Sequence, residues 1–431
     1  MMSVISNLLA LLERWGTRPE RRPGLAARWH SWIAARRAPT VGLSLLVAAF
    51  ALLRLVYLTA DPPLGITTSR VFYTDEGWYA RNAVAWVLTG HWHREGDFNP
   101  AVNIPVWTIL QAAMFRLFGV SLYTARLLTV AFFVALLVLF YEFAAHYVPR
   151  WAALVGCLLL ATNYRLFAYS RLALLEVPMM AFLMASLLMA ARARRGHWRL
   201  GVALSAGAFA CAYLTKTTAV IGLPAVVYLL WLASDGLGNK LKGLALWATV
   251  LLLILYVHYV TVALPHYPDY VYFNRLNIAG RQFDEWRPLA VLQHVAQVVW
   301  LGLTLYDPLL TGVVMGVTLL LLSSRQFRQC PAVRVALLGG GAMMAVMLTV
   351  TYHPTRYFLP LGVPLALLAA AALSHLHNAR GGWLLRPVFA ILLVSVLAVQ
   401  GHAILDYLAR PEYSFVEMCA QVRQQLAEEE R

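Results

Sequence analysis

Long apolar stretches alternate with short polar loops along most of the chain. About 20 apolar residues cross a bilayer as a helix, and the first such stretch covers residues 40–58. The later stretches expected to cross are 125–147, 152–166, 177–191, 200–214, 217–233, 243–264, 309–322, 335–351, 358–373 and 388–405. The pattern predicts an all-α polytopic membrane protein with about eleven transmembrane helices.

Two other apolar segments are expected to lie on the outer membrane surface. Segment 104–118, interrupted by Gln111 and Arg116, has a helical length of about 22 Å, short of the roughly 30 Å core. Segment 290–305 places Gln293, His294 and Gln297 on one helical face, as interfacial helices do. We therefore expect two interfacial helices, the first of them inside a large external loop.

Basic residues decide the expected orientation. With 104–118 outside the bilayer core, the basic loops at 192–199 and 240–242 face the cytoplasm, as the positive-inside rule requires. Residues 1–12 are interpreted as an interfacial amphipathic helix, not a cleavable signal. The expected regions are a basic cytoplasmic tail (1–39), a transmembrane module (40–264) with external loop 59–124, an external loop with its interfacial helix (265–308), C-terminal helices (309–405) and a short external tail (406–431).

Composition agrees with this reading. The chain is 61% hydrophobic and only 13% charged, whereas soluble domains carry roughly a quarter charged residues. The net charge of +15 comes largely from the N-terminal tail and the short loops, so it indicates topology and no nucleic-acid partner. The four cysteines lie far apart, and neither a disulfide framework nor a zinc site is predicted.

Most acidic residues fall on the expected outer side. Asp75 and Glu76 begin a helix expected over 76–88, where a carboxylate is favoured by capping and by the helix dipole. Neighbours on a helix point about 100° apart, so both acids are not expected to face one ligand. On these grounds, a catalytic role for Asp75 and a role as a helix N-cap alone are equally favoured.

The remaining candidates each have a structural alternative. Glu176 either pairs with Arg171 or joins Asp75 in a site. Lys216 and Arg356 either anchor span ends to lipid head groups or hold a phosphate together. Arg54 is expected to snorkel. The histidines show no ligand spacing, so no metal site is predicted; His353 and the pair His91 and His93 are weaker candidates for site members.

An ordered set of motifs resembles a known family. The motifs are Thr74-Asp75-Glu76-Gly77-Trp78-Tyr79-Ala80, Gly90-His91-Trp92, Asn103-Ile104-Pro105-Val106-Trp107, Phe115-Arg116-Leu117-Phe118-Gly119, Ala125-Arg126-Leu127, residues 170–176 and Arg356-Tyr357-Phe358-Leu359-Pro360-Leu361. Together they cover about residues 40–375. This pattern resembles the GT-C membrane glycosyltransferases that use polyprenyl-phosphate sugars, namely the protein O-mannosyltransferases and the lipid A aminoarabinose transferases.

The resemblance implies roles for individual residues. Asp75 would be the catalytic base, and Glu176 would occupy the second acidic position. Lys216, Arg356 and Arg126 would bind the donor phosphate. The substrate-binding set would be Glu76, Tyr79, Tyr357 and His353.

The resemblance also implies the reaction and its place. A sugar would pass, with inversion, from a polyprenyl-phosphate donor to a lipid, glycan or protein acceptor, as in lipid A modification of the cell envelope. The site would face the periplasm or exterior of a bacterial inner membrane. The donor, the acceptor and membrane lipids are the expected partners; no cofactor is assigned, and a divalent metal is left open.

Departures from the family pattern keep other functions open. Glu176 replaces the usual Asp, and Asn103-Ile104-Pro105 replaces the common Lys-Pro-Pro. The large external C-terminal domain of many relatives is expected to be absent. The alternatives are a lipid or solute transporter and a non-catalytic family member. Acids at the rim and the lack of an internal repeat argue against transport.

Overall fold

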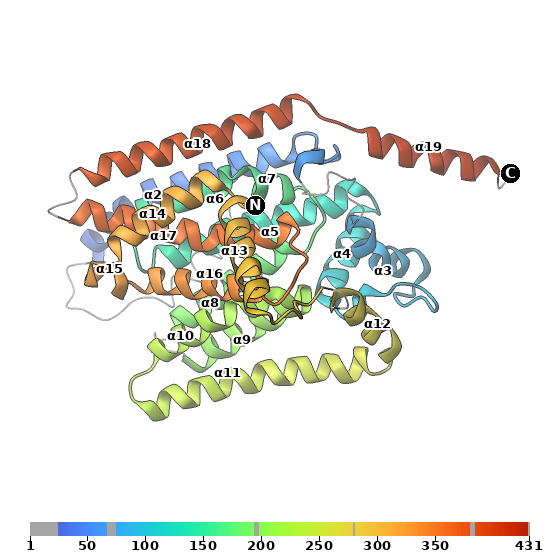
Figure 1. Ribbon diagram of the computed structural model, residues 1–431, viewed down its shortest axis with the longest axis horizontal. Coiled ribbons are helices and arrows are strands. Elements are labelled where there is room, and N and C mark those ends of the chain that lie inside the picture. Colours follow the sequence, from blue (N-terminus) through green and yellow to red (C-terminus); the bar gives the residue numbers. More distant parts are fainter. Residues whose placement is uncertain (1–24, 67–74, 194–197, 279–280, 380–383, 430–431) are drawn as a thin grey trace.

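The computed structural model describes residues 25–66, 75–193, 198–278, 281–379 and 384–429, and within these ranges it describes side chains from residue 39 onward except at 64, 277–278 and 426–429. These residues form a helical bundle (Figure 1), in which two isolated bridges, Asp61 with Glu412 and Gln282 with Val350, are the only β pairing. The predicted all-α class is therefore confirmed. The interfacial helix expected over 1–12 and the arginines at 194 and 195 lie outside the described residues.

The helices follow one another with short connections. In chain order they are α2 (Leu25–Leu55), η1 (Leu64–Ile66), α3 (Asp75–Thr89), η2 (Pro100–Val102), α4 (Pro105–Phe118), α5 (Leu122–Ala144), α6 (Arg150–Thr162), α7 (Tyr164–Tyr169), α8 (Glu176–Arg192), α9 (Trp198–Thr215), η3 (Thr217–Gly222), α10 (Leu223–Ala233), α11 (Leu237–His258), η4 (Tyr259–Ala263), α12 (Tyr267–Ile278), α13 (Pro288–Thr304), α14 (Pro308–Leu321), α15 (Arg325–Gln329), α16 (Pro331–Met347), η5 (Thr355–Leu361), α17 (Gly362–Asn378), α18 (Leu385–Ala409) and α19 (Ser414–Glu429).

The bundle has buried central helices and apolar outer ones. In the most apolar part of the segment formed by η5 and α17, 72% of the residues are buried, against 6% in the corresponding part of the segment formed by α11 and η4. Leu252, Leu253 and Tyr256 of α11 are exposed. Figure 1 shows α11 and α18 on opposite outer sides of the bundle. Long helices that are apolar on their exposed faces require a lipid environment, so the chain is a multi-pass membrane protein.

The number of spans is not fixed by helix length. Four helices of the described residues are long and apolar enough to cross, and a fifth is added if the bent pair of α13 and α14 counts as one span. Several expected spans are shorter helices or are broken. Segment 152–166 divides at Asn163, which has extended backbone and accepts a hydrogen bond from Leu166 N at 2.9 Å, capping α7. The count of eleven stays a prediction.

The helices expected on the outer surface are present as helices. α4 covers the predicted 104–118, and α13 covers 290–305 and meets α14 at 104°. α3, α4 and α12 gather at one end of the bundle (Figure 1). Three α-helices were not predicted: α12 in the loop after 265, the short α15 in the loop after 322, and α19 in the tail after 406. The elements at this end position the candidate site.

The prediction for Arg54 was wrong. Its side chain is fully buried and does not reach a lipid surface. It donates to Ser170 Oγ at 2.6 Å and to Ala161 O at 3.2 Å, and its guanidinium lies 3.4 Å from the Phe133 ring centroid. Backbone carbonyls, a hydroxyl and a π face replace water around the charge. Arg54 therefore ties α2 to the segment between α6 and α8.

Candidate active site

Four charged residues from four separate elements meet at the end of the bundle that holds α3 and α4. Asp75 and Glu176 are the first residues of α3 and α8, Lys216 precedes η3, and Arg356 lies in η5. Arg356 Nη1 donates to Asp75 Oδ2, and Lys216 Nζ donates to Glu176 Oε1. Arg356 Nε lies 3.5 Å from the same Glu176 oxygen. We call these four residues the ion cluster.

The two acids of the ion cluster differ in accessibility. The side chain of Glu176 is 3% exposed, whereas that of Asp75 is 33% exposed. Glu176 Oε2 is buried and has no hydrogen-bond partner among the described residues. Glu176 is therefore enclosed with the two cations, while Asp75 is the acid of the ion cluster that is open to solvent.

Two tyrosines complete this surface. The Tyr357 ring lies 4.6 Å from Lys216 Nζ and 5.6 Å from the Arg356 guanidinium, so it supports both cations through its π face. Tyr79 follows Asp75 by one turn of α3, and burial raises the pKa of its hydroxyl. Tyr79 thus stays protonated at neutral pH and can donate a hydrogen bond.

Glu76 and Arg126 form a different pair, away from the ion cluster. Arg126 Nε and Nη2 donate to the two Glu76 oxygens at 2.9 and 2.6 Å. Arg126 Nη1 donates to Leu58 O and Ala60 O. Glu76 Oε1 also accepts from Ala173 N at 2.6 Å. Both side chains hydrogen-bond to protein groups, which supports a structural role. The substrate- and phosphate-binding roles that the resemblance implied for them stay predictions.

Arg171 and His353 also have partners other than those the sequence suggested. Arg171 Nη2 donates to Val56 O and Tyr57 O at 2.7 and 2.6 Å, so the alternative in which it pairs with Glu176 was wrong. His353 is buried, with Nε2 donating to Met347 O at 3.0 Å. Burial lowers its pKa. A neutral His353 thus donates to a backbone carbonyl. Its role in substrate binding stays a prediction, which no contact of the described residues supports.

An apolar groove begins next to the ion cluster. Three of its lining residues continue the elements that carry the cluster: Met180 follows Glu176 by four positions, Pro360 follows Arg356 by four, and Ile221 follows Lys216 by five. Leu183, Met184, Leu187, Gly222, Ala225, Val335, Ala336, Gly339, Val363, Pro364 and Leu367 line the rest. The groove therefore runs along α8, α10, α16 and α17, from a point about one helical turn beyond the charged residues.

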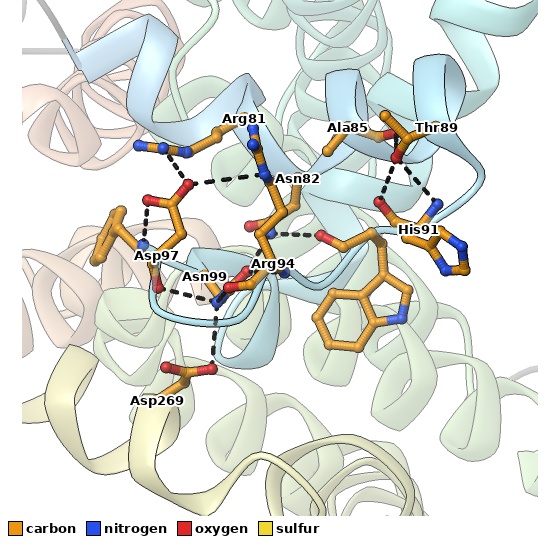
Figure 2. Close-up of polar contacts among 11 residues, drawn as sticks. Arg81, Asn82, Ala85, Thr89, His91, Arg94, Asp97, Asn99 and Asp269 are labelled. Carbon is orange, nitrogen blue, oxygen red and sulfur yellow. Dashed lines mark hydrogen bonds and ion pairs between the residues drawn. The ribbon is translucent and has the colours of Figure 1, made fainter.

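Sequence reasoning missed a polar network in the first external loop (Figure 2). Asn82 Nδ2 donates to Asn99 Oδ1 at 2.8 Å, and Asn99 Nδ2 donates to Asp269 Oδ2 at 3.2 Å. Arg81 pairs with Asp97 in the same loop. Asp269 Oδ2 also lies 2.6 Å from His93 Nε2, within hydrogen-bonding distance. The partners are up to 176 positions apart, so no local spacing could have revealed them.

The fold and part of the sequence are similar to those of known proteins. Residues 100–261 match the family model described as dolichyl-phosphate-mannose-protein mannosyltransferase. Solved structures of ArnT from Cupriavidus metallidurans match over 86% of this chain and 76% of theirs in the apo state, with 18% identity and a TM-score of 0.59. The form bound to undecaprenyl phosphate covers 85% and 75%, with 18% identity and a TM-score of 0.58. No curated protein sequence matches the chain.

A third match extends further along this chain. Arabinosyltransferase EmbB from Mycobacterium smegmatis covers 94% of this chain and 43% of its own, with 15% identity and a TM-score of 0.54. The chain has the GT-C fold. The resemblance to polyprenyl-phosphate-sugar glycosyltransferases is confirmed at the level of fold, and the family model supports it over residues 100–261. The ion cluster takes residues from both inside and outside that matched segment.

Proposed function

We propose that the chain transfers a sugar from a polyprenyl-phosphate donor to an acceptor hydroxyl on the non-cytoplasmic side of a bacterial cell membrane. The observation that carries the proposal is that an apolar groove begins about one helical turn from the ion cluster, on three of the elements that carry it. Two cations suit a lipid phosphate, and a groove with an apolar lining suits a prenyl chain. A phosphate between Lys216 and Arg356 would place that chain against Met180 and Pro360.

The charges of the ion cluster suggest how donor binding prepares the base. Asp75, Glu176, Lys216 and Arg356 balance one another when no ligand is bound, and Arg356 is shared between both acids. An incoming phosphate competes with Asp75 for Arg356, because both are anions on one guanidinium. Release of Asp75 would turn an ion-pair partner into a carboxylate free to accept a proton.

The residues of the ion cluster take these parts in the chemical step. Asp75 takes the proton of the acceptor hydroxyl, while the oxygen of that hydroxyl attacks the anomeric carbon from the face opposite the phosphate. The bond between that carbon and the phosphate oxygen breaks, and the electron pair leaves with the polyprenyl phosphate. Lys216 and Arg356 stabilise the charge that develops on this leaving group. Attack opposite the leaving group inverts the anomeric configuration.

Release of polyprenyl phosphate tests the assignment. The full chain is reconstituted in liposomes with a panel of polyprenyl-phosphate sugars and a cell-envelope extract as the source of acceptors. We expect Asp75→Asn to lower the rate of polyprenyl phosphate release about 100-fold or more, since general-base catalysis contributes about 10²–10⁴-fold. Asp97→Asn is the matched control, because Asp97 is an ion-paired acid of the same external loop outside the ion cluster.

The outcomes separate the proposal from its rivals. Equal release of polyprenyl phosphate by the wild type and Asp75→Asn would refute the catalytic assignment of Asp75. A wild type that binds polyprenyl phosphate but releases none from any donor indicates a non-catalytic family member. Movement of intact donor across the bilayer without cleavage indicates a transporter.

A further inference from the structure

A second chemical feature lies outside the ion cluster. His93 from the first external loop meets His266 and Asp269, which lie just before and within α12. One ligand atom from each lies within 4.8 Å of the others. The two imidazole rings stack at 4.0 Å between centroids, and His93 Nε2 is 2.6 Å from Asp269 Oδ2. We call these three residues the His–Asp trio.

The surroundings hold the His–Asp trio in place. Trp92 packs edge-on against the His93 ring at 5.5 Å and against the His266 ring at 5.0 Å. Buried Asn99 donates to Asp269 Oδ2, and its own carbonyl oxygen accepts from Asn82 (Figure 2). Hydrogen bonds from outside the ligand set orient metal ligands in this way. The His93 and Asp269 side chains are 25% and 27% exposed, so an ion can reach them from solvent.

We propose that the His–Asp trio binds one divalent transition-metal ion of the zinc type. Two imidazoles and one carboxylate are a ligand set that zinc accepts, and three protein ligands leave a fourth position open. Such an ion fastens the external loop to α12, two segments that are also joined by the Asn99 hydrogen bond to Asp269 and by the stacked rings of Phe98 and Phe273. The inference does not depend on the proposed glycosyl transfer.

The geometry requires a small adjustment. Tetrahedral ligands about 2.1 Å from zinc lie about 3.4 Å from one another, so the direct contact between His93 and Asp269 at 2.6 Å opens by less than about 1 Å. The His266 nitrogen approaches from within 4.8 Å. Rotations of the side chains achieve both changes, because all three residues are only partly buried.

Zinc binding by the full chain tests the proposal. The protein is purified in detergent through a tag without histidines, stripped with a chelator and titrated with zinc sulfate by calorimetry. We expect one tight site per wild-type chain, with binding at least about tenfold weaker in His93→Asn and His266→Asn, since even outer-shell changes cost about 10–100-fold. His91→Asn is the matched control, because His91 is an exposed neighbour in the same loop that does not belong to the trio.

Zinc should also raise the unfolding temperature of the wild type and of His91→Asn, but not of the two trio variants. This shift is measured on each protein against its own metal-free form, so a variant with altered stability still reports on binding. A wild type without a tight zinc site overturns the proposal and leaves an imidazole–carboxylate pair. Equal zinc affinity in His266→Asn and the wild type overturns it too, because the trio then does not act as one site.

Discussion

Replacing Glu76 by Gln should destabilise the fold much more than replacing the adjacent Asp75 by Asn. Glu76 accepts three hydrogen bonds, two from Arg126 and one from Ala173 N. The side chains of Glu76 and Arg126 are 10% and 3% exposed. Glutamine would present an amide NH₂ to a donor and leave the Arg126 charge buried without its counter-ion. Breaking a buried pair in this way costs about 3–5 kcal/mol.

Asp75 is in a different position. Its side chain is 33% exposed, and Arg356 keeps Glu176 as a partner when Asp75 is changed. Solvent at Asp75 screens its pair with the buried Arg356, so breaking that pair should cost about 1 kcal/mol. The two substitutions should therefore differ by at least about 2 kcal/mol, which is more than tenfold in the ratio of folded to unfolded protein.

The measurement is unfolding of the purified chain in mixed micelles of increasing SDS fraction, followed by circular dichroism. The double variant Glu76→Gln with Arg126→Met removes both partners, and it should recover part of the loss of Glu76→Gln because no uncompensated charge remains. Equal midpoints for Glu76→Gln and Asp75→Asn would refute the division into a structural and a functional acid. Additive effects in the double variant would refute direct coupling of the buried pair.

Three further outcomes are expected. Ala336→Phe, which fills the apolar groove, should weaken binding of a long polyprenyl phosphate about tenfold, but not that of a short prenyl phosphate, in a ligand-depletion assay; equal effects on both lipids would contradict the groove assignment. Gly362→Ala should destabilise by about 1–3 kcal/mol in the SDS assay, because an added Cβ overlaps the Tyr306 hydroxyl; an unchanged midpoint would show that Tyr306 moves freely. Single cysteines at Glu95 and Asn239 should label from opposite sides of intact cells; labelling from one side would refute the predicted topology.

The periodicity and charge of the sequence determined much of the architecture. Continuous apolar stretches predict helices directly, because a backbone in lipid must satisfy its own hydrogen bonds. Segments 104–118 and 290–305 were correctly predicted as helices. The break at Asn163 and the helix α12 were not predicted. The break depends on a local cap and α12 depends on packing against a distant loop, and neither leaves an apolar signature of its own.

The candidate site shows the same division. Helix geometry alone separated Asp75 from Glu76, since adjacent residues on a helix point apart. Which charges pair was decided only by the tertiary structure: Glu176 meets Lys216 and Arg356, and not the nearby Arg171.

The contacts of Arg54 and of the His–Asp trio were likewise decided by the tertiary structure. The sequence determined that charged residues gather at the ends of apolar helices, because the bilayer excludes them. The tertiary structure decided which of them face one another, because such contacts join segments whose separation along the chain carries no pattern. His93 and Asp269, 176 positions apart, could be recognised as neighbours only in the folded protein.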